Sequence, residues 1–465
     1  MAVLASCRLC QRRLPAGRWR LPGPLNGTVT RQEQRNQLAG FGLPGREVVS
    51  AIMQVGGVAM SGTVIGNRVL HPLALALLTA TIMGGGSAKA DETIKVGGLV
   101  SITGGAASIG KIAGTAWKLA IDEINASGGV LGKKIELVMA DTTTDPTHAL
   151  NEARRLVDSE KVVAILGPAT SQETVPTLAV TTAARVTQLS TAASTQITVE
   201  TAPYHFTTSP RGANQLIPSI DYALDSLKVT RIGLISDNGG AAKSAIADIV
   251  PYMKEKGVEP SSVQEFTFRT EDMTPQLLGL RSSGAEVVVL MNSTGDDARK
   301  FLENRMDIGW DVPVLASPAM TTTAVGNAAV VGHEPFNGVY SLQFEGLTYC
   351  DGDPLGQSLF SKYAKRAESA VPDLERIGGP ASLQLYYIQP YLLAAAMNGS
   401  GKTDGPSVTA WLENNVQTVD TIVGKLSASA GNHFLPPATS LKIVKNPDRP
   451  REGGLVERAD CGRQG

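Results

Sequence analysis

The first residues whose spacing could do chemistry lie in the stretch SITGGAASIGKIAG, residues 101–114. Gly105, Gly110 and Lys111 have the GxxxxGK spacing of a phosphate-binding loop. In such a loop the next residue is Ser or Thr, whose hydroxyl coordinates Mg²⁺ beside the phosphates. Here it is Ile112, whose aliphatic side chain cannot bind a hard cation. The stretch therefore does not favour a nucleotide site.

A similar pattern occurs in AMNGSGKTDG, where Gly-Lys-Thr occupies residues 401–403 but Ala396 replaces the first glycine. A phosphate-binding loop joins a strand to a helix. Here an apolar helical stretch precedes the motif, and Gly405 with Pro406 indicates the start of a new helix. We interpret this segment as a turn between two helices.

The sequence after residue 90 also lacks the GxSxG, HExxH and CxxC motifs of common enzyme and metal sites. Its histidines are scattered along the chain, at His148, His205, His333 and His433. The formal net charge of -1 argues against a nucleic-acid partner. We therefore expect a protein that is not an enzyme and needs no cofactor or metal.

Hydroxyl groups gather in two loops that each follow an apolar strand, GPATSQET after VVAIL and STAASTQ after VTQL. Neighbouring parallel strands end at the same edge of a sheet, so Ser171, Ser190 and Ser194 could converge on one ligand. Hydroxyls and free backbone amides at a helix start suit a carboxylate. The alternative is that these side chains only cap helices.

The elements that must position these loops are strands alternating with helices. TIKVGGLV, KIELVMAD and VVAILG alternate with the helical patterns AGTAWKLAIDEINASGG and THALNEARRLVDSE. A second series runs from RIGLISD through AIADIVPYMKEKG to EVVVLMNST and VPVLAS. Such alternation is typical of βαβ units around a parallel sheet, and 465 residues exceed what one core usually supports. The predicted fold is α/β, with two doubly wound lobes.

The N-terminal region has the features of an export signal. Arg68 precedes an apolar run from Val69 to Met83, and a small-x-small pattern ends at Ala90. We expect a signal peptide over residues 60–90 and hence a periplasmic protein, with residues 1–59 either a mis-annotated start or a disordered extension.

Only two cysteines, Cys350 and Cys461, lie beyond this segment. The sequence does not show whether these two cysteines lie close together in the fold, so it is compatible with a disulfide and with two free thiols. The tail, residues 446–465, is polar and is expected to fray.

Together these segments resemble the periplasmic substrate-binding proteins of branched-chain amino acid ABC importers. The resemblance spans residues 94–445 and is carried by IKVGGLVSITGGAASIGK, AIDEINASGGVLGKKIELVMAD, AILGPATSQETVPTLAVTTAARVTQLSTAAS and YYIQPYLLAAAM. It implies two lobes joined by a three-segment hinge, with residues 91–211 and 344–431 in lobe 1 and residues 212–343 and 432–465 in lobe 2. It also implies a monomer that closes on a small solute and docks on a membrane permease.

The resemblance implies roles for individual residues. Ser171 matches a carboxylate-binding serine, Ala192 a residue whose backbone meets the ligand, and Ser194 a ligand hydroxyl. Tyr387 matches an aromatic that closes over the ligand, and Ile109 falls where some members place a Trp against the ligand side chain. The remaining candidates for the cleft loops of the two lobes are Ser101 and Asn292.

The sequence departs from this family in the second lobe. Gly240 and Ala241 stand where a Tyr-Gly is common, and Ala319 or Met320 stands where an acid would pair with a ligand ammonium. No ammonium partner is apparent in that lobe. The ligand is therefore predicted to be a branched-chain amino acid or a related small carboxylate or amide, with an aromatic or keto acid as the alternative. A ligand-sensing regulator on the same fold is a further alternative, which the export signal disfavours.

Overall fold

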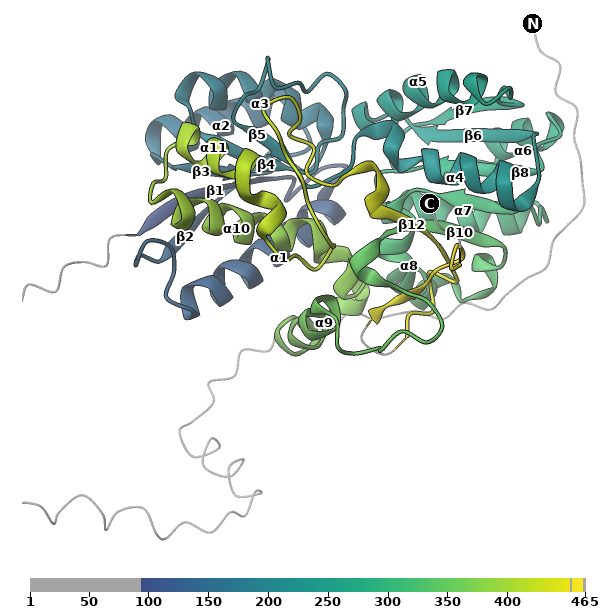
Figure 1. Ribbon diagram of the computed structural model, residues 1–465. Coiled ribbons are helices and arrows are strands. Elements are labelled where there is room, and N and C mark those ends of the chain that lie inside the picture. Colours follow the sequence, from purple (N-terminus) through teal and green to yellow (C-terminus); the bar gives the residue numbers. More distant parts are fainter. Residues whose placement is uncertain (1–92, 452–453, 463–465) are drawn as a thin grey trace, which may run out of the picture. The chain divides into compact units, whose positions relative to one another are not determined.

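The computed structural model describes residues 93–451 and 454–462, which form two lobes that each contain a parallel sheet (Figure 1). The first sheet has the strand order β2-β1-β3-β4-β5, and all neighbouring strands are parallel. Its strands are β1 Ile94–Val100, β2 Ile135–Asp141, β3 Ala164–Leu166, β4 Thr187–Ser190 and β5 His205–Thr207. The central strands β1, β3 and β4 are almost wholly buried, as expected where helices cover both faces of a sheet.

The second sheet has the order β12-β10-β9-β8-β6-β7. Its strands are β6 Ile232–Asp237, β7 Ser262–Phe266, β8 Val287–Met291, β9 Val314–Ala316, β10 Val339–Phe344 and β12 Leu441–Lys445. These strands are parallel except that the edge strand β12 is antiparallel to β10. The two parallel sheets confirm the predicted fold class, and the antiparallel edge is a departure from a purely parallel second lobe.

Helices cover both sheets. In the first lobe α1 packs against α10, α2 against α3, and α11 against α10. In the second lobe α7 packs against α6 and α8, and α4 lies beside α5 and β12. The helices are α1 Ala107–Ala126, α2 Pro146–Arg154, α3 Ser171–Ala184, α4 Ile217–Tyr222, α5 Gly240–Glu255, α6 Thr274–Ser282, α7 Gly295–Asp307, α8 Pro318–Val331, α9 Leu359–Ala370, α10 Pro380–Ser400 and α11 Gly405–Asn415.

The chain passes between the lobes three times. It leaves the first sheet after β5, returns after β10 through α9 to α10, and crosses again between α11 and β12. These crossings form the predicted three-segment hinge.

The C-terminal tail is packed against the second lobe, so the expectation that it frays is wrong for residues 446–451 and 454–462. Strand β13, Val456–Glu457, pairs with β11, Thr348–Tyr349, and Cys350 forms a disulfide with Cys461. Ala459 also donates its backbone N–H to Ile443 in β12. The disulfide resolves the alternative that the sequence left open.

The predicted signal peptide and the segment before it lie outside the described residues. Within the part that the structure describes, no helix combines the length and the apolar character needed to cross a membrane.

Candidate functional site: a cleft between the lobes

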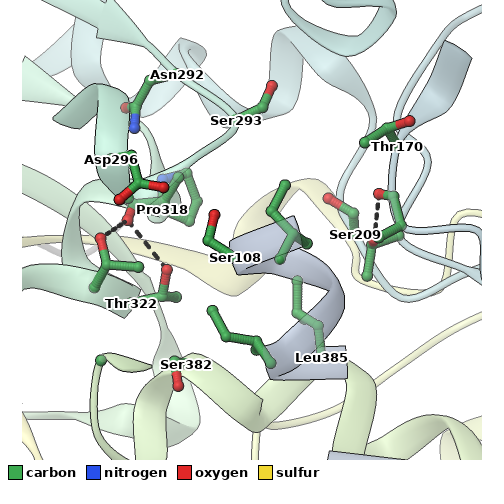
Figure 2. A pocket seen from close by; sticks show the side chains of 18 of the residues that line it. Ser108, Thr170, Ser209, Asn292, Ser293, Asp296, Pro318, Thr322, Ser382 and Leu385 are labelled. Atoms are coloured by element: carbon green, nitrogen blue, oxygen red, sulfur yellow. Dashed lines mark hydrogen bonds between the residues drawn. The ribbon is translucent and has the colours of Figure 1, made fainter. Parts of the chain in front are cut away.

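A cleft of about 390 Å³ lies between the two lobes, where the carboxyl ends of strands from both sheets face each other. Figure 2 shows its two walls, with Asn292, Asp296 and Thr322 on one side and Thr170 with Ser209 opposite. The cleft collects loops from both sheets because strands of open parallel sheets place their following loops at one edge.

Two joined loops form the lobe-one wall. Thr170 caps α3, and the Ser171 hydroxyl accepts a hydrogen bond of 3.0 Å from the Ala193 backbone N–H. Thr191 donates its hydroxyl to the Ala169 carbonyl at 2.8 Å. In the first turn of α3 the backbone N–H of Glu173 donates to the Thr170 hydroxyl, whereas those of Ser171 and Gln172 have no acceptor inside the helix. This wall thus presents a serine hydroxyl and free amides, the chemistry that suits a carboxylate.

A buried carboxylate holds this wall in place. Glu173 is fully buried, and its side chain accepts hydrogen bonds from the hydroxyls of Ser101 at 2.8 Å, Thr142 and Thr170. These donors follow β1, follow β2 and precede α3, respectively. The Glu173 side chain therefore fixes the relative position of three segments at the sheet edge.

The start of α1 closes the same side of the cleft. Ser108, Ile109, Lys111 and Ile112 line it. A Cβ on Gly110 would lie 1.8 Å from the Ser101 carbonyl oxygen, so only glycine lets α1 approach this loop. The glycine of the GxxxxGK pattern therefore serves packing, while its lysine lies at the cleft.

The lobe-two wall consists mainly of the starts of α5, α7 and α8. Asp237, fully buried at the end of β6, accepts backbone N–H groups from Gly239 at 2.7 Å and Ser293 at 2.6 Å. Burial raises the pKa of Asp237 to about 6. The two loops that it joins carry Gly240 and Asn292, which line the cleft.

The sequence shows no ammonium partner in the second lobe, and the structure places one acid of that lobe at the cleft. Asp296, in the first turn of α7, lines the cleft, and one of its carboxylate oxygens lies 3.6 Å from an Arg299 guanidinium nitrogen. Ala319 also lines the cleft, whereas Met320 is fully buried. The segment TGDDARK after β8 could have predicted this acid, because a helix that follows a parallel strand begins at the edge of the sheet where ligands bind.

Of the residues proposed from the sequence, Ser171, Ile109 and Asn292 line the cleft. Ala192 does not line it, but the next residue, Ala193, does. Asn292 donates its side-chain amide to the Thr294 carbonyl at 2.8 Å, which fixes its orientation.

Three proposed hydroxyls are engaged elsewhere. Ser101 donates to Glu173, the Ser194 hydroxyl lies 3.3 Å from that of Ser244 in α5, and Ser190 contacts His205 Nε2 at 2.7 Å. Burial lowers the pKa of His205 to about 3, which keeps its imidazole neutral. These side chains support the cleft loops rather than line the cleft.

Tyr387 also lies away from the cleft, and its neighbour Tyr386 lines it. The Tyr387 hydroxyl donates to Glu123 of α1 at 2.6 Å, together with that of Tyr391. Successive residues of a helix point about 100° apart, so only one of the two tyrosines can face the ligand. Burial raises the pKa of Tyr386 to about 12, so its phenol stays neutral.

No cluster of potential metal ligands occurs among residues 93–451 and 454–462.

The comparisons with known proteins show the family and the fold of this chain. A family model described as periplasmic binding protein matches residues 93–445. An amino acid binding protein of Pseudomonas aeruginosa is 28% identical over 357 residues, covering 76% of this chain and 90% of that protein. A Leu/Ile/Val-binding protein homolog 7 of Brucella abortus is 29% identical over 279 residues, covering 58% of this chain and 69% of that protein.

Solved structures share the fold. The branched-chain amino acid binding protein LivJ from Streptococcus pneumoniae, in complex with isoleucine, superposes with a TM-score of 0.62 at 20% identity, covering 78% of this chain and 98% of that one. A solute binding protein of an ABC transporter from Rhodopseudomonas palustris, in complex with p-hydroxybenzoic acid, gives 0.65 at 18% identity, covering 79% and 96%. Because the family model spans most of the sequence, the chain belongs to the periplasmic binding protein family, a family of binding proteins and not of enzymes.

Proposed function

We propose that this protein is the solute-binding component of an ABC importer, which captures a small carboxylate between its lobes and delivers it to a membrane permease. The observation that carries the proposal is the lobe-one wall, where the Ser171 hydroxyl and the free amides of α3 face the cleft. The relatives named for amino acid binding and the related structures with isoleucine or p-hydroxybenzoic acid support this class of ligand.

The mechanism follows from the two-lobed geometry. The carboxylate first binds lobe one at the Ser171 hydroxyl and the backbone N–H groups at the start of α3. Interactions of the bound ligand with Asn292 and the start of α7 then favour the closed arrangement, because a ligand shifts an equilibrium by its differential affinity for the two states. No covalent step is involved, and export through the segment at residues 60–90 would place the protein in the periplasm.

A calorimetric and thermal-shift panel tests the proposal. The ligands are leucine, valine, aromatic acids, keto acids, short amides, and ATP with Mg²⁺. A ligand at about a hundred times its dissociation constant should stabilise the folded protein by about 2.7 kcal/mol. Stabilisation by ATP alone would contradict the proposal.

Ser171→Ala should weaken binding of the best carboxylate about tenfold or more, because a hydrogen bond to a charged group is lost. Ser261→Ala is the matched control, since the Ser261 hydroxyl contacts Ser283 outside the cleft. Equal affinities for the two variants would show that the carboxylate does not bind at the α3 start.

A further inference from the structure

The cleft carries an unbalanced set of charges. Among the residues that the structure describes, four charged ones line the cleft: the cations Lys111, Arg299 and Arg376, and the acid Asp296. Lys111 belongs to α1, and Arg299 and Asp296 belong to α7. Arg376 belongs to the short helical turn Leu374–Ile377 before α10. The cations therefore approach the cleft from three directions.

Protein acids neutralise these cations only weakly. Neither Lys111 nor Arg376 forms an ion pair with any residue that the structure describes. Arg299 has two acidic neighbours, but the nitrogen-to-oxygen distances are 3.6 Å to Asp296 and 3.8 Å to Glu303, longer than a charge-assisted hydrogen bond. Arg299 can therefore turn toward a ligand without breaking a close contact.

Asp296, the one acid among the described residues that line the cleft, already lies near a cation. The cation beside Asp296 is Arg299, on its own helix, and both side chains are 34% exposed. A ligand ammonium at Asp296 would lie close to this guanidinium. The repulsion between two cations would offset much of the attraction to the carboxylate.

The backbone adds to the positive potential. Residues at or near the starts of α1, α3, α5, α7 and α8 all line the cleft, including Ser108, Ser171, Gly240, Asp296 and Pro318. Each helix start carries a partial positive charge. A cleft lined by one sign of charge concentrates ions of the opposite sign.

We propose that the ligand is a net anion: a carboxylate without an ammonium group, selected by the cationic set of Lys111, Arg299 and Arg376. This inference rests on the proposed function and narrows its ligand class. It also gives the lysine of the GxxxxGK stretch a role in charge selection. The carboxylate end binds at Ser171, and the side facing α7 prefers a hydroxyl, keto or second carboxylate oxygen to an amine.

Matched ligand pairs that differ only at the amine test this choice. Isothermal titration calorimetry would compare leucine with the keto acid of the same side chain, and phenylalanine with phenylpyruvate. The keto acid should bind about tenfold or more tightly than its amino acid. Its affinity should fall as the salt concentration is raised, because the cationic side chains at the rim are screened.

Substitution of each cation tests whether these side chains cause the preference for the keto acid. Lys111→Gln, Arg299→Gln and Arg376→Gln should each weaken keto acid binding about threefold to tenfold and change amino acid binding much less. Lys118→Gln, on the same helix as Lys111 but paired with Asp122 at 2.6 Å and outside the cleft, is the control and should leave both affinities unchanged. Asp296→Asn should strengthen keto acid binding.

The opposite pattern would overturn the inference while sparing the proposed function. In that case leucine binds more tightly than its keto acid, and Asp296→Asn abolishes the difference because Asp296 holds the ammonium. Inorganic phosphate that binds as tightly as the keto acid would overturn the assignment to a carboxylate. If the unmodified protein binds no carboxylate at all, the proposed function itself fails.

Discussion

The two walls of the cleft are both held by a buried carboxylate, but the carboxylates have different donors. In lobe one, Glu173 accepts three side-chain hydroxyls, from Ser101, Thr142 and Thr170. In lobe two, Asp237 accepts two backbone N–H groups, from Gly239 and Ser293. Lobe one is thus fixed by the chemical identity of several side chains, and lobe two mainly by the course of its backbone.

This difference indicates which positions can change and so alter the ligand specificity. Substitution of a donor around Glu173 removes a buried hydrogen bond, so the lobe-one wall tolerates little change. Around Asp237 the backbone N–H groups of Gly239 and Ser293 are donors, so a change of the Ser293 side chain removes only its own hydroxyl contact and keeps both backbone hydrogen bonds. Ligand preference can therefore vary in lobe two while the carboxylate site that we propose in lobe one stays constant.

The largest effect on stability is expected for Glu173→Leu. Three buried hydroxyls would lose their acceptor, so the free energy of unfolding should fall by about 3 kcal/mol or more. Glu173→Gln keeps one acceptor oxygen and should cost about half as much. Urea denaturation measures both. A loss below about 1 kcal/mol for the leucine variant would show that the hydroxyls find other acceptors.

The second prediction concerns pH and Asp237. Because burial raises the pKa of Asp237 from 3.8 to about 6, the folded protein binds this proton more tightly than the unfolded chain. The stabilising contribution of the proton is present at low pH and is lost as pH rises through about 6. Acidification toward pH 3.8 should therefore raise the stability of the unmodified protein relative to Asp237→Asn by on the order of 3 kcal/mol.

Denaturant titrations of both proteins at several pH values measure this difference. Glu265→Gln is the control for loss of a carboxylate. Glu265 is exposed and lies near the end of the neighbouring strand β7. A difference between the unmodified protein and Asp237→Asn that does not change with pH would contradict the shifted pKa.

The fold and one wall of the cleft could be predicted from the sequence because both depend on local patterns. The alternation of buried strands with helices predicts two sheets, and a hydroxyl-rich loop after a strand predicts Ser171 at the cleft. Asp296 follows the same rule, but the family resemblance points to a position near residue 320, at the end of a different strand.

What could not be predicted depends on register and on distant contacts. A shift of one residue on α10 rotates the side chain by about 100°, so sequence does not distinguish Tyr386 from Tyr387. Ser190 is at the correct strand end, but its hydroxyl contacts His205, on the adjacent strand β5. The packed tail depends on the Cys350–Cys461 disulfide, which joins residues 111 positions apart.

The smallest effect is expected where the two lobes meet, at a pair of buried glutamines. Gln384 of α10 donates its amide to the side-chain oxygen of Gln343 in β10 at 3.1 Å, and the same oxygen accepts the Phe344 backbone N–H at 2.8 Å. The backbone bond fixes the orientation of Gln343 and hence that of Gln384. The Gln384 side-chain oxygen is left buried with no partner among the residues that the structure describes.

Gln384→Met should therefore change the free energy of unfolding by less than about 1 kcal/mol, because the lost hydrogen bond between the lobes is offset by removal of an unpaired acceptor. Gln389→Met is the matched control on the same helix. Gln389 accepts from the Trp117 indole at 2.8 Å and donates to Thr208 at 3.0 Å, so its loss should cost about 2 kcal/mol or more. Urea denaturation compares the two variants. Equal losses would mean that Gln384 is as fully hydrogen-bonded as Gln389, and that the contact between the lobes at this point contributes as much to stability as the core of lobe one.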